Sequence, residues 1–112
     1  MNELDTQFAL LRKLESNPEC TQRELSREIG VSLGKINYCM KKLSDKGWIK
    51  LTNFAKNPQK IGYMYLLTSK GIEEKARLTF AFLKIKSQEY ELLKDEINKL
   101  KQDTEKILKV KK

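Results

Sequence analysis

The residues between positions 32 and 42 combine small, polar and cationic side chains that could bind the edges of bases in duplex DNA. In the major groove a lysine can donate to O6 and N7 of guanine, and an asparagine can form two hydrogen bonds with adenine. A tyrosine can donate to a phosphate, and a glycine removes bulk where a helix approaches the groove. Lysines one turn further along would reach phosphates, which position a protein without reading sequence. The expected contact residues in this run are Ser32, Gly34, Lys35, Asn37, Tyr38, Lys41 and Lys42.

Two other segments offer groups for the DNA backbone. A helix that starts at Thr21 would point its free amides at a phosphate, and Gln22 and Arg23 stand in its first turn. A polar segment nearer the middle of the chain could lie along the flanking minor groove or its phosphates. Its expected contact residues are Lys56, Asn57, Gln59 and Lys60. Each of these polar residues alone could equally be ordinary solvated surface, so the complete set carries the interpretation.

Net charge follows the same segments. Residues 1–31 carry a net charge of −2, residues 32–70 of +7 and residues 71–112 of +3, within a chain of 112 residues and net charge +8. A basic surface can serve solubility or bind an anionic membrane as well as nucleic acid. Because the excess coincides with the residues that could contact bases and phosphates, we favour nucleic acid as the partner.

Apolar spacing predicts the elements that position these side chains. Helices are expected over about residues 4–15, 21–29 and 33–46, and β-strands over 48–51 and 63–67. A helix, a tight turn, a second helix and then a hairpin form the plan of a winged helix-turn-helix. The predicted fold class is therefore mainly α with one small β-hairpin, the wing.

Local signals mark the ends of these helices. Thr21 and Glu24 form a capping box, in which the threonine hydroxyl accepts a backbone N–H. Gly30 suits the left-handed conformation that closes a helix, and Ser32 can cap the helix that follows. The positions expected to face the core from the first and third helices are Leu4, Phe8, Leu11, Leu14, Leu33, Ile36, Met40 and Leu43.

A long C-terminal helix is predicted from Ile72, since neither proline nor glycine follows Gly71. The apolar residues Leu78, Phe82 and Ile85 could pack on the N-terminal domain. We therefore expect a DNA-binding domain over residues 1–70, and a helix over residues 71–112 that ends in a frayed basic tail.

The same helix contains a coiled-coil pattern. Apolar residues there alternate spacings of three and four, as a and d positions of a heptad do, and the flanking pairs Glu89–Lys94 and Glu96–Lys101 would attract each other across a parallel dimer. A single amphipathic helix that folds back on its own domain is the alternative. The residues predicted to form a dimer interface are Tyr90, Leu93, Ile97, Leu100, Thr104 and Ile107.

Composition argues against catalysis and against a cofactor. Histidine, the commonest general base, is absent, and the five glycines are too scattered for a phosphate-binding loop. Two cysteines without histidine make no metal site. Cys20 and Cys39 are expected to be buried, although a thiolate redox sensor is an alternative for Cys20, which precedes a helix start. No apolar run reaches the roughly 20 residues of a membrane span, so we expect a soluble, cytoplasmic protein.

The motifs resemble those of the MarR-type winged-helix regulators of bacteria over roughly residues 10–75. The similar stretches are Thr21–Leu25, Gly30–Ser32, Lys42–Ile49 and Leu67–Gly71, and they look closest to the small subgroup associated with exopolysaccharide gene clusters. The resemblance implies a homodimer that regulates transcription from a pseudo-palindromic operator. The chain departs from the family in two ways. It has residues 57–60 in place of the wing's Asp-x-Arg element, and almost nothing precedes its first helix.

The sequence thus predicts a sequence-specific regulator that binds double-stranded DNA, most simply a repressor, with no small-molecule effector assigned. A winged-helix module that docks a partner protein through its C-terminal helix is the main alternative. The charge of +7 over residues 32–70 favours DNA, because a docking surface does not require it. A nucleoid protein that binds DNA without sequence preference also fits this charge.

Overall fold

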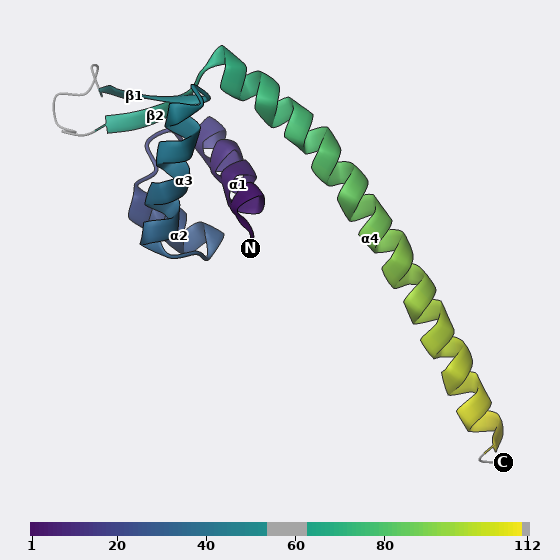
Figure 1. The fold of residues 1–112 in the computed structure, drawn as a ribbon. Helices are drawn as coiled ribbons and strands as arrows, with labels where there is room; N and C mark the ends of the chain where they lie inside the picture. The colour runs from purple at the N-terminus through teal and green to yellow at the C-terminus, as the bar shows by residue number, and fades with distance from the viewer. Residues whose placement is uncertain (54–62, 111–112) are drawn as a thin grey trace. The chain divides into compact units, whose positions relative to one another are not determined.

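The computed structural model describes residues 1–53 and 63–110, and it confirms the predicted fold class. Three helices and an antiparallel hairpin are followed by one long helix (Figure 1). Two compact units are distinguished, Met1–Leu78 and Thr79–Lys112. The elements are α1 (Glu3–Ser16), α2 (Gln22–Ile29), α3 (Leu33–Asp45), β1 (Ile49–Asn53), β2 (Tyr63–Leu67) and α4 (Ser69–Val110).

The predicted helix ends are present and depend on local hydrogen bonds. The Thr21 hydroxyl accepts the Glu24 N–H at 3.1 Å, and the Ser32 hydroxyl accepts the Lys35 N–H at 3.1 Å. Each hydroxyl thus binds one of the backbone N–H groups that have no partner within the first turn of a helix. Gly30 closes α2 with φ +82°, a left-handed conformation that side chains rarely adopt. Gly30 and Ser32 thus fix the short turn between α2 and α3.

The core of the first unit lies between α1, α2 and α3. Most of the residues expected to face inward are buried, but Leu4 is 48% and Leu33 is 43% exposed, so the inward assignment of these two is wrong. Each stands in the first turn of its helix, where neighbouring elements no longer cover it. The buried core consists of Leu10, Leu11, Leu14, Cys20, Leu25, Ile36, Cys39, Met40, Leu43, Trp48, Ile49 and Leu78.

The hairpin and the start of α4 are joined at Trp48. Strands β1 and β2 pair antiparallel with Ile49 opposite Leu67, and the Thr68 N–H donates to the Trp48 carbonyl at 2.9 Å. The Thr68 hydroxyl accepts the Gly71 N–H at 3.1 Å, as expected of a cap. A Cβ on Gly71 would overlap the Trp48 carbonyl, so only glycine permits this approach. The predicted wing tip lies in residues 54–62, outside the described residues.

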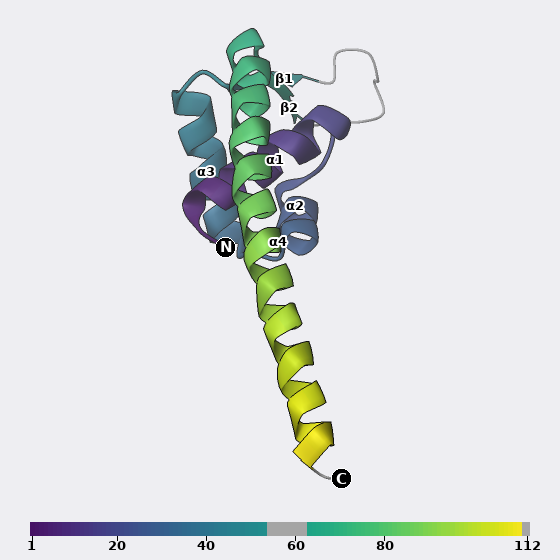
Figure 2. The same ribbon diagram turned by 90° about the vertical axis from the view of Figure 1, so that its right-hand side faces the viewer.

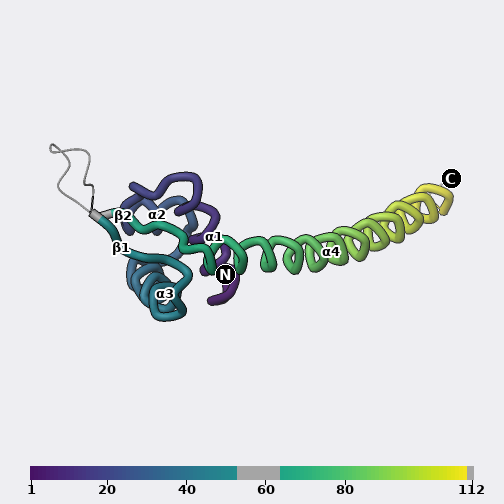
Figure 3. The backbone as a smooth tube through the Cα atoms, turned by 90° about the horizontal axis from the view of Figure 1, so that it is seen from above, coloured from purple at the N-terminus to yellow at the C-terminus, as the bar shows by residue number. Residues whose placement is uncertain are grey.

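Helix α4 is continuous over 42 residues, about 63 Å at 1.5 Å per residue. Figures 2 and 3 show it as one unbroken helix. Leu78 is buried and Phe82 is half-buried, but Ile85 is 47% exposed. Leu78 therefore packs within the first unit as predicted, whereas Phe82 and Ile85 belong to the second unit. None of the described helices is long and apolar enough to cross a membrane.

Candidate nucleic-acid interface

Helix α3 separates its apolar side chains from the predicted contact residues. Ile36, Cys39, Met40 and Leu43 are buried against the rest of the first unit. The remaining face is polar or cationic and exposed. The structure places Ser32 and Gly34 at its N-terminal end, followed by Asn37, Tyr38, Lys41 and Lys42, all exposed. Most of the groups that sequence singled out for DNA thus share one accessible helix face.

Gly34 leaves an open space on this face. A Cβ built on Gly34 meets no atom within 4 Å, and its φ lies outside the positive region, so neither packing nor backbone strain requires a glycine there. In a helix glycine is less favourable than alanine by about 1 kcal/mol. The folded chain therefore gives no reason for a glycine at this position. A close approach of another molecule to this part of the helix would give one.

Lys35 is the one predicted residue of α3 that is only half-exposed. Its ammonium donates to the carbonyl of Met1 while its backbone N–H donates to Ser32. The side chain is therefore bound to the start of the chain in this conformation. To reach a guanine it would have to exchange the Met1 carbonyl for the base.

Tyr38 and Lys42 interact on the exposed face. The Lys42 ammonium lies over the Tyr38 ring, 5.4 Å from its centroid, and Tyr38 is 51% exposed. Such a cation–π contact contributes about 0.5–1 kcal/mol at an exposed site. It holds a phenol and a positive charge side by side, one helical turn apart.

Lys46 also belongs to the basic segment but has a structural role. Its ammonium lies 4.7 Å from the centroid of the Trp48 ring and donates to Gln7 Oε1 at 3.3 Å. It thus gives a hydrogen-bond donor to the amide oxygen of Gln7, a residue that is only 2% exposed. The charge count over residues 32–70 therefore overstates the charge that α3 offers to a ligand.

The predicted contacts outside α3 are only partly described. Arg23 is exposed and Gln22 half-exposed in the first turn of α2, where backbone N–H groups favour a phosphate. The wing residues Lys56, Asn57, Gln59 and Lys60 lie outside the described residues. Lys50 on β1 is exposed and was not predicted as a contact, although its alternation with the buried Ile49 could have marked it.

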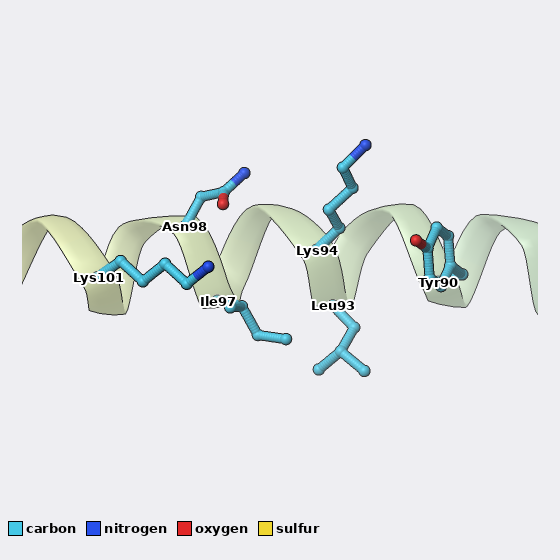
Figure 4. Close-up of a pocket in the computed structure, with 6 residues that line it drawn as sticks. All are labelled: Tyr90, Leu93, Lys94, Ile97, Asn98 and Lys101. Carbon is cyan, nitrogen blue, oxygen red and sulfur yellow. The ribbon is translucent and has the colours of Figure 1, made fainter.

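The predicted dimer residues form an exposed stripe on α4. Each of the six is exposed, from Ile97 at 43% to Tyr90 at 63% among those with large apolar side chains. Figure 4 shows Leu93 and Ile97 leaving the same side of the helix, while Lys94 and Asn98 leave the opposite side. A shallow groove on this surface is lined by Tyr90, Leu93, Lys94, Ile97, Asn98 and Lys101.

The two cysteines are buried thiols rather than thiolates. Burial, together with a 3.6 Å hydrogen bond from its Sγ to Glu24 Oε2, raises the pKa of Cys20 to about 11. Burial also raises the pKa of Cys39. The raised pKa opposes the thiolate alternative for Cys20, because burial and the nearby carboxylates of Glu24 and Glu28 disfavour the charged form. No group of side chains in residues 1–53 and 63–110 could hold a metal ion.

A family model matches the N-terminal part of the chain. Residues 3–50 match a family described as "Winged helix-turn-helix DNA-binding". No curated protein matches the sequence.

Solved structures share the fold. A mutant of Lactococcus lactis ZitR in apo form has a TM-score of 0.63 and 22% identity over 81% of this chain and 67% of its own. PcaV, a transcriptional regulator from Streptomyces coelicolor, has a TM-score of 0.62 and 20% identity over 89% of this chain and 78% of its own. A structure of MarR has a TM-score of 0.54 and 26% identity over 80% of this chain and 61% of its own. The chain spans only 55% of a second PcaV structure, in complex with its natural ligand.

Residues 3–50 therefore have the winged helix-turn-helix fold and match a family that is described by DNA binding. The fold of the chain is that of the MarR-type regulators, which confirms the resemblance seen in the sequence motifs. The matched family is described by DNA binding, which fits the prediction that the chain is not an enzyme.

Proposed function

We propose that this chain is a sequence-specific regulator of transcription that binds double-stranded DNA as a homodimer on a pseudo-palindromic operator. In this proposal α3 enters the major groove, the first turn of α2 contacts a phosphate, and the wing contacts the flanking minor groove or its phosphates. Binding over a promoter would exclude the polymerase, so the protein would act as a repressor. Its place of action would be the bacterial cytoplasm, where its DNA is.

The exposed face of α3 carries the proposal. It presents Asn37, Tyr38, Lys41 and Lys42 to solvent on a helix whose other side is anchored in the core. Asparagine and lysine supply the hydrogen-bond donors and acceptors that the major groove reads, and a helix fits that groove. The unexplained space at Gly34 stands at the N-terminal end of this face, where recognition helices meet bases.

Salt dependence should identify the phosphate contacts. Six to ten lysine–phosphate contacts in a dimer imply a loss of about 10³–10⁵ in affinity between about 50 and 200 mM salt. Replacing Lys41 and Lys42 with alanine should lower the slope of log K against log salt, by about 0.9 for each phosphate that the protein no longer neutralises.

A matched control for this experiment exists on α4. Lys99→Ala with Lys106→Ala removes the same charge from two exposed lysines of the second unit. The slope should remain that of the natural chain. Equal losses in the two double variants would mean that total charge drives binding, and would remove the face of α3 from the proposal.

Selection of bound duplexes from a random pool at physiological salt tests sequence specificity directly. Enrichment of an inverted repeat with half-sites about 34–36 Å apart would support base readout by two copies. Recovery of unenriched DNA would replace the proposal with a non-specific nucleoid protein. No recovery even at low salt would exclude DNA and favour the protein-docking alternative, for which the exposed stripe on α4 is the available surface.

A further inference from the structure

The apolar stripe of α4 is longer than its sequence pattern first indicates. Extending the heptad register backward from Tyr90 places Leu83 at an a position and Lys86 at d, and then Thr79, Ala76 and Ile72 at core positions. Spacings of three and four alternate without interruption from Ile72 to Ile107, and every position in that series is exposed. We call this series the seam: Ile72, Ala76, Thr79, Leu83, Lys86, Tyr90, Leu93, Ile97, Leu100, Thr104 and Ile107.

The seam does not coincide with the face of α4 that packs on the first unit. Gly71 and Leu78 are the buried residues of α4, and both are c positions in this register. A c position lies roughly 100–155° around the helix from the a and d positions. Packing within the first unit therefore uses another face of α4 than the seam. The seam itself extends over about 53 Å of helix.

Two polar side chains of the seam, Thr104 and Lys86, have partners on their own helix. The Thr104 hydroxyl donates to the Leu100 carbonyl of its own helix at 2.9 Å, so its hydrogen bond is already satisfied. Lys86 is the only charged residue in the seam, and its ammonium reaches out to Glu89 Oε2 at 3.2 Å. A single Asn or Lys at an a position of a coiled coil specifies register and number of strands at a cost in stability, and Lys86, at a d position, is the one charged side chain of this core.

The shallow groove on α4 has the lining that a partner side chain needs. In a parallel coiled coil the side chain at a d position inserts between a, d, e and the next a position of the facing helix. Tyr90, Leu93, Lys94 and Ile97 occupy those four positions, and all four line the groove. The groove is therefore where Leu93 of a second copy would insert.

The charged rows beside the seam select the orientation. In a parallel pair Glu89 faces Lys94 of the other copy, and Glu96 faces Lys101, which gives four attractive pairs. In an antiparallel pair each row faces itself, so these residues give no opposite-charge pair. Charge complementarity therefore favours a second copy of this chain in parallel.

We infer that α4 pairs with α4 of a second copy as a parallel coiled coil along the whole seam from Ile72 to Ile107, and that Lys86 fixes its register. The inference deepens the proposed homodimer by naming its interface. Parallel pairing brings both N-terminal domains to the same end of the coil, where two half-sites of one operator could be bound.

Sedimentation of the full chain without DNA tests the interface. Leu93→Lys should weaken dimerisation by at least about a hundredfold, because each dimer would bury two charges. Leu92→Lys is the matched control, since Leu92 is the adjacent residue, is 71% exposed and lies off the seam. It should leave the dimer unchanged. Equal effects of the two substitutions, or a natural chain that is monomeric at high concentration, would overturn the inference.

A substitution with rescue tests the orientation. Lys101→Glu should weaken the dimer by roughly tenfold, because it sets the Glu96 carboxylate of each copy against a second carboxylate on the facing helix. Adding Glu96→Lys should restore the affinity with charges reversed. Tighter association of the single variant would indicate an antiparallel pair and refute the assignment.

A further substitution tests the role of Lys86. Lys86→Leu should tighten association by about tenfold or more and admit trimers beside dimers. An unchanged affinity would exclude Lys86 from the interface. Because none of these measurements contains DNA, their failure would leave DNA binding by α3 to be judged by the selection experiment alone.

Discussion

The substitution Gly34→Ala should separate what the fold needs from what DNA needs. A methyl group at this position meets no atom within 4 Å, and the backbone there is outside the positive φ region. Alanine is favoured over glycine in a helix by about 0.5–1 kcal/mol, the smaller figure suiting the first turn. The variant should therefore be more stable than the natural chain.

The expected gain can be measured by thermal unfolding. For a unit of this size 1 kcal/mol corresponds to about 4–8 °C, so Tm should rise by about 2–8 °C. Gly30→Ala is the matched control. It also meets no atom within 4 Å, but its φ of +82° strains any side chain, so its Tm should fall.

The same methyl group should weaken DNA binding. If the helix axis approaches the groove closely at Gly34, the added carbon must displace either the helix or a base contact. We expect at least about a tenfold loss in affinity, or about 1.4 kcal/mol, for the preferred duplex at fixed salt. A variant that is more stable and binds as tightly as the natural chain would refute the close approach, and with it the explanation of this glycine.

Other substitutions test the wider assignment. Gly71→Ala should destabilise the first unit by about 1–3 kcal/mol or more in denaturant unfolding, because its Cβ would overlap the Trp48 carbonyl. Because folding raises the pKa of Cys20 from 9.0 to about 11, stability should fall as pH rises from about 9 toward 11, and Cys20→Ala should remove that part of the loss. Replacing Lys56 and Lys60 with alanine should reduce the salt slope of DNA binding while leaving sequence preference intact, and an unchanged slope would exclude the wing.

Local signals in the sequence predicted the helix-turn-helix well. Thr21, Gly30 and Ser32 act through bonds to residues a few positions away, so their roles are readable without the tertiary structure. Leu4 and Leu33 show the limit of this reasoning. Both obey the helical period, but burial also requires a neighbouring element, and none covers them in the folded chain.

Long-range contacts of the basic residues were not predictable from the sequence. Lys35 binds the Met1 carbonyl and Lys46 binds Gln7, across 34 and 39 positions respectively. A charge count treats such lysines as equivalent to Lys41, which is exposed. The seam was underestimated for a related reason. Lys86 interrupts its hydrophobicity, so the proposed register was not followed beyond it, although Ile72 and Leu83 occupy matching positions and are exposed.

The proposed coiled coil and the proposed DNA face are coupled through concentration. A half-site bound by one α3 helix has few contacts, so a single domain should bind weakly, while a preformed dimer gains the second half-site at high effective concentration. Below the dissociation constant of the dimer, operator occupancy should therefore rise with the square of protein concentration. Lys86 keeps that constant higher than an all-apolar seam would. Lys86→Leu should thus make the occupancy curve first-order at lower protein concentrations and shift it to tighter binding, without any change in the DNA-contacting residues. An occupancy curve that does not respond to Lys86→Leu, although the dimer has tightened, would show that two copies do not bind the operator together.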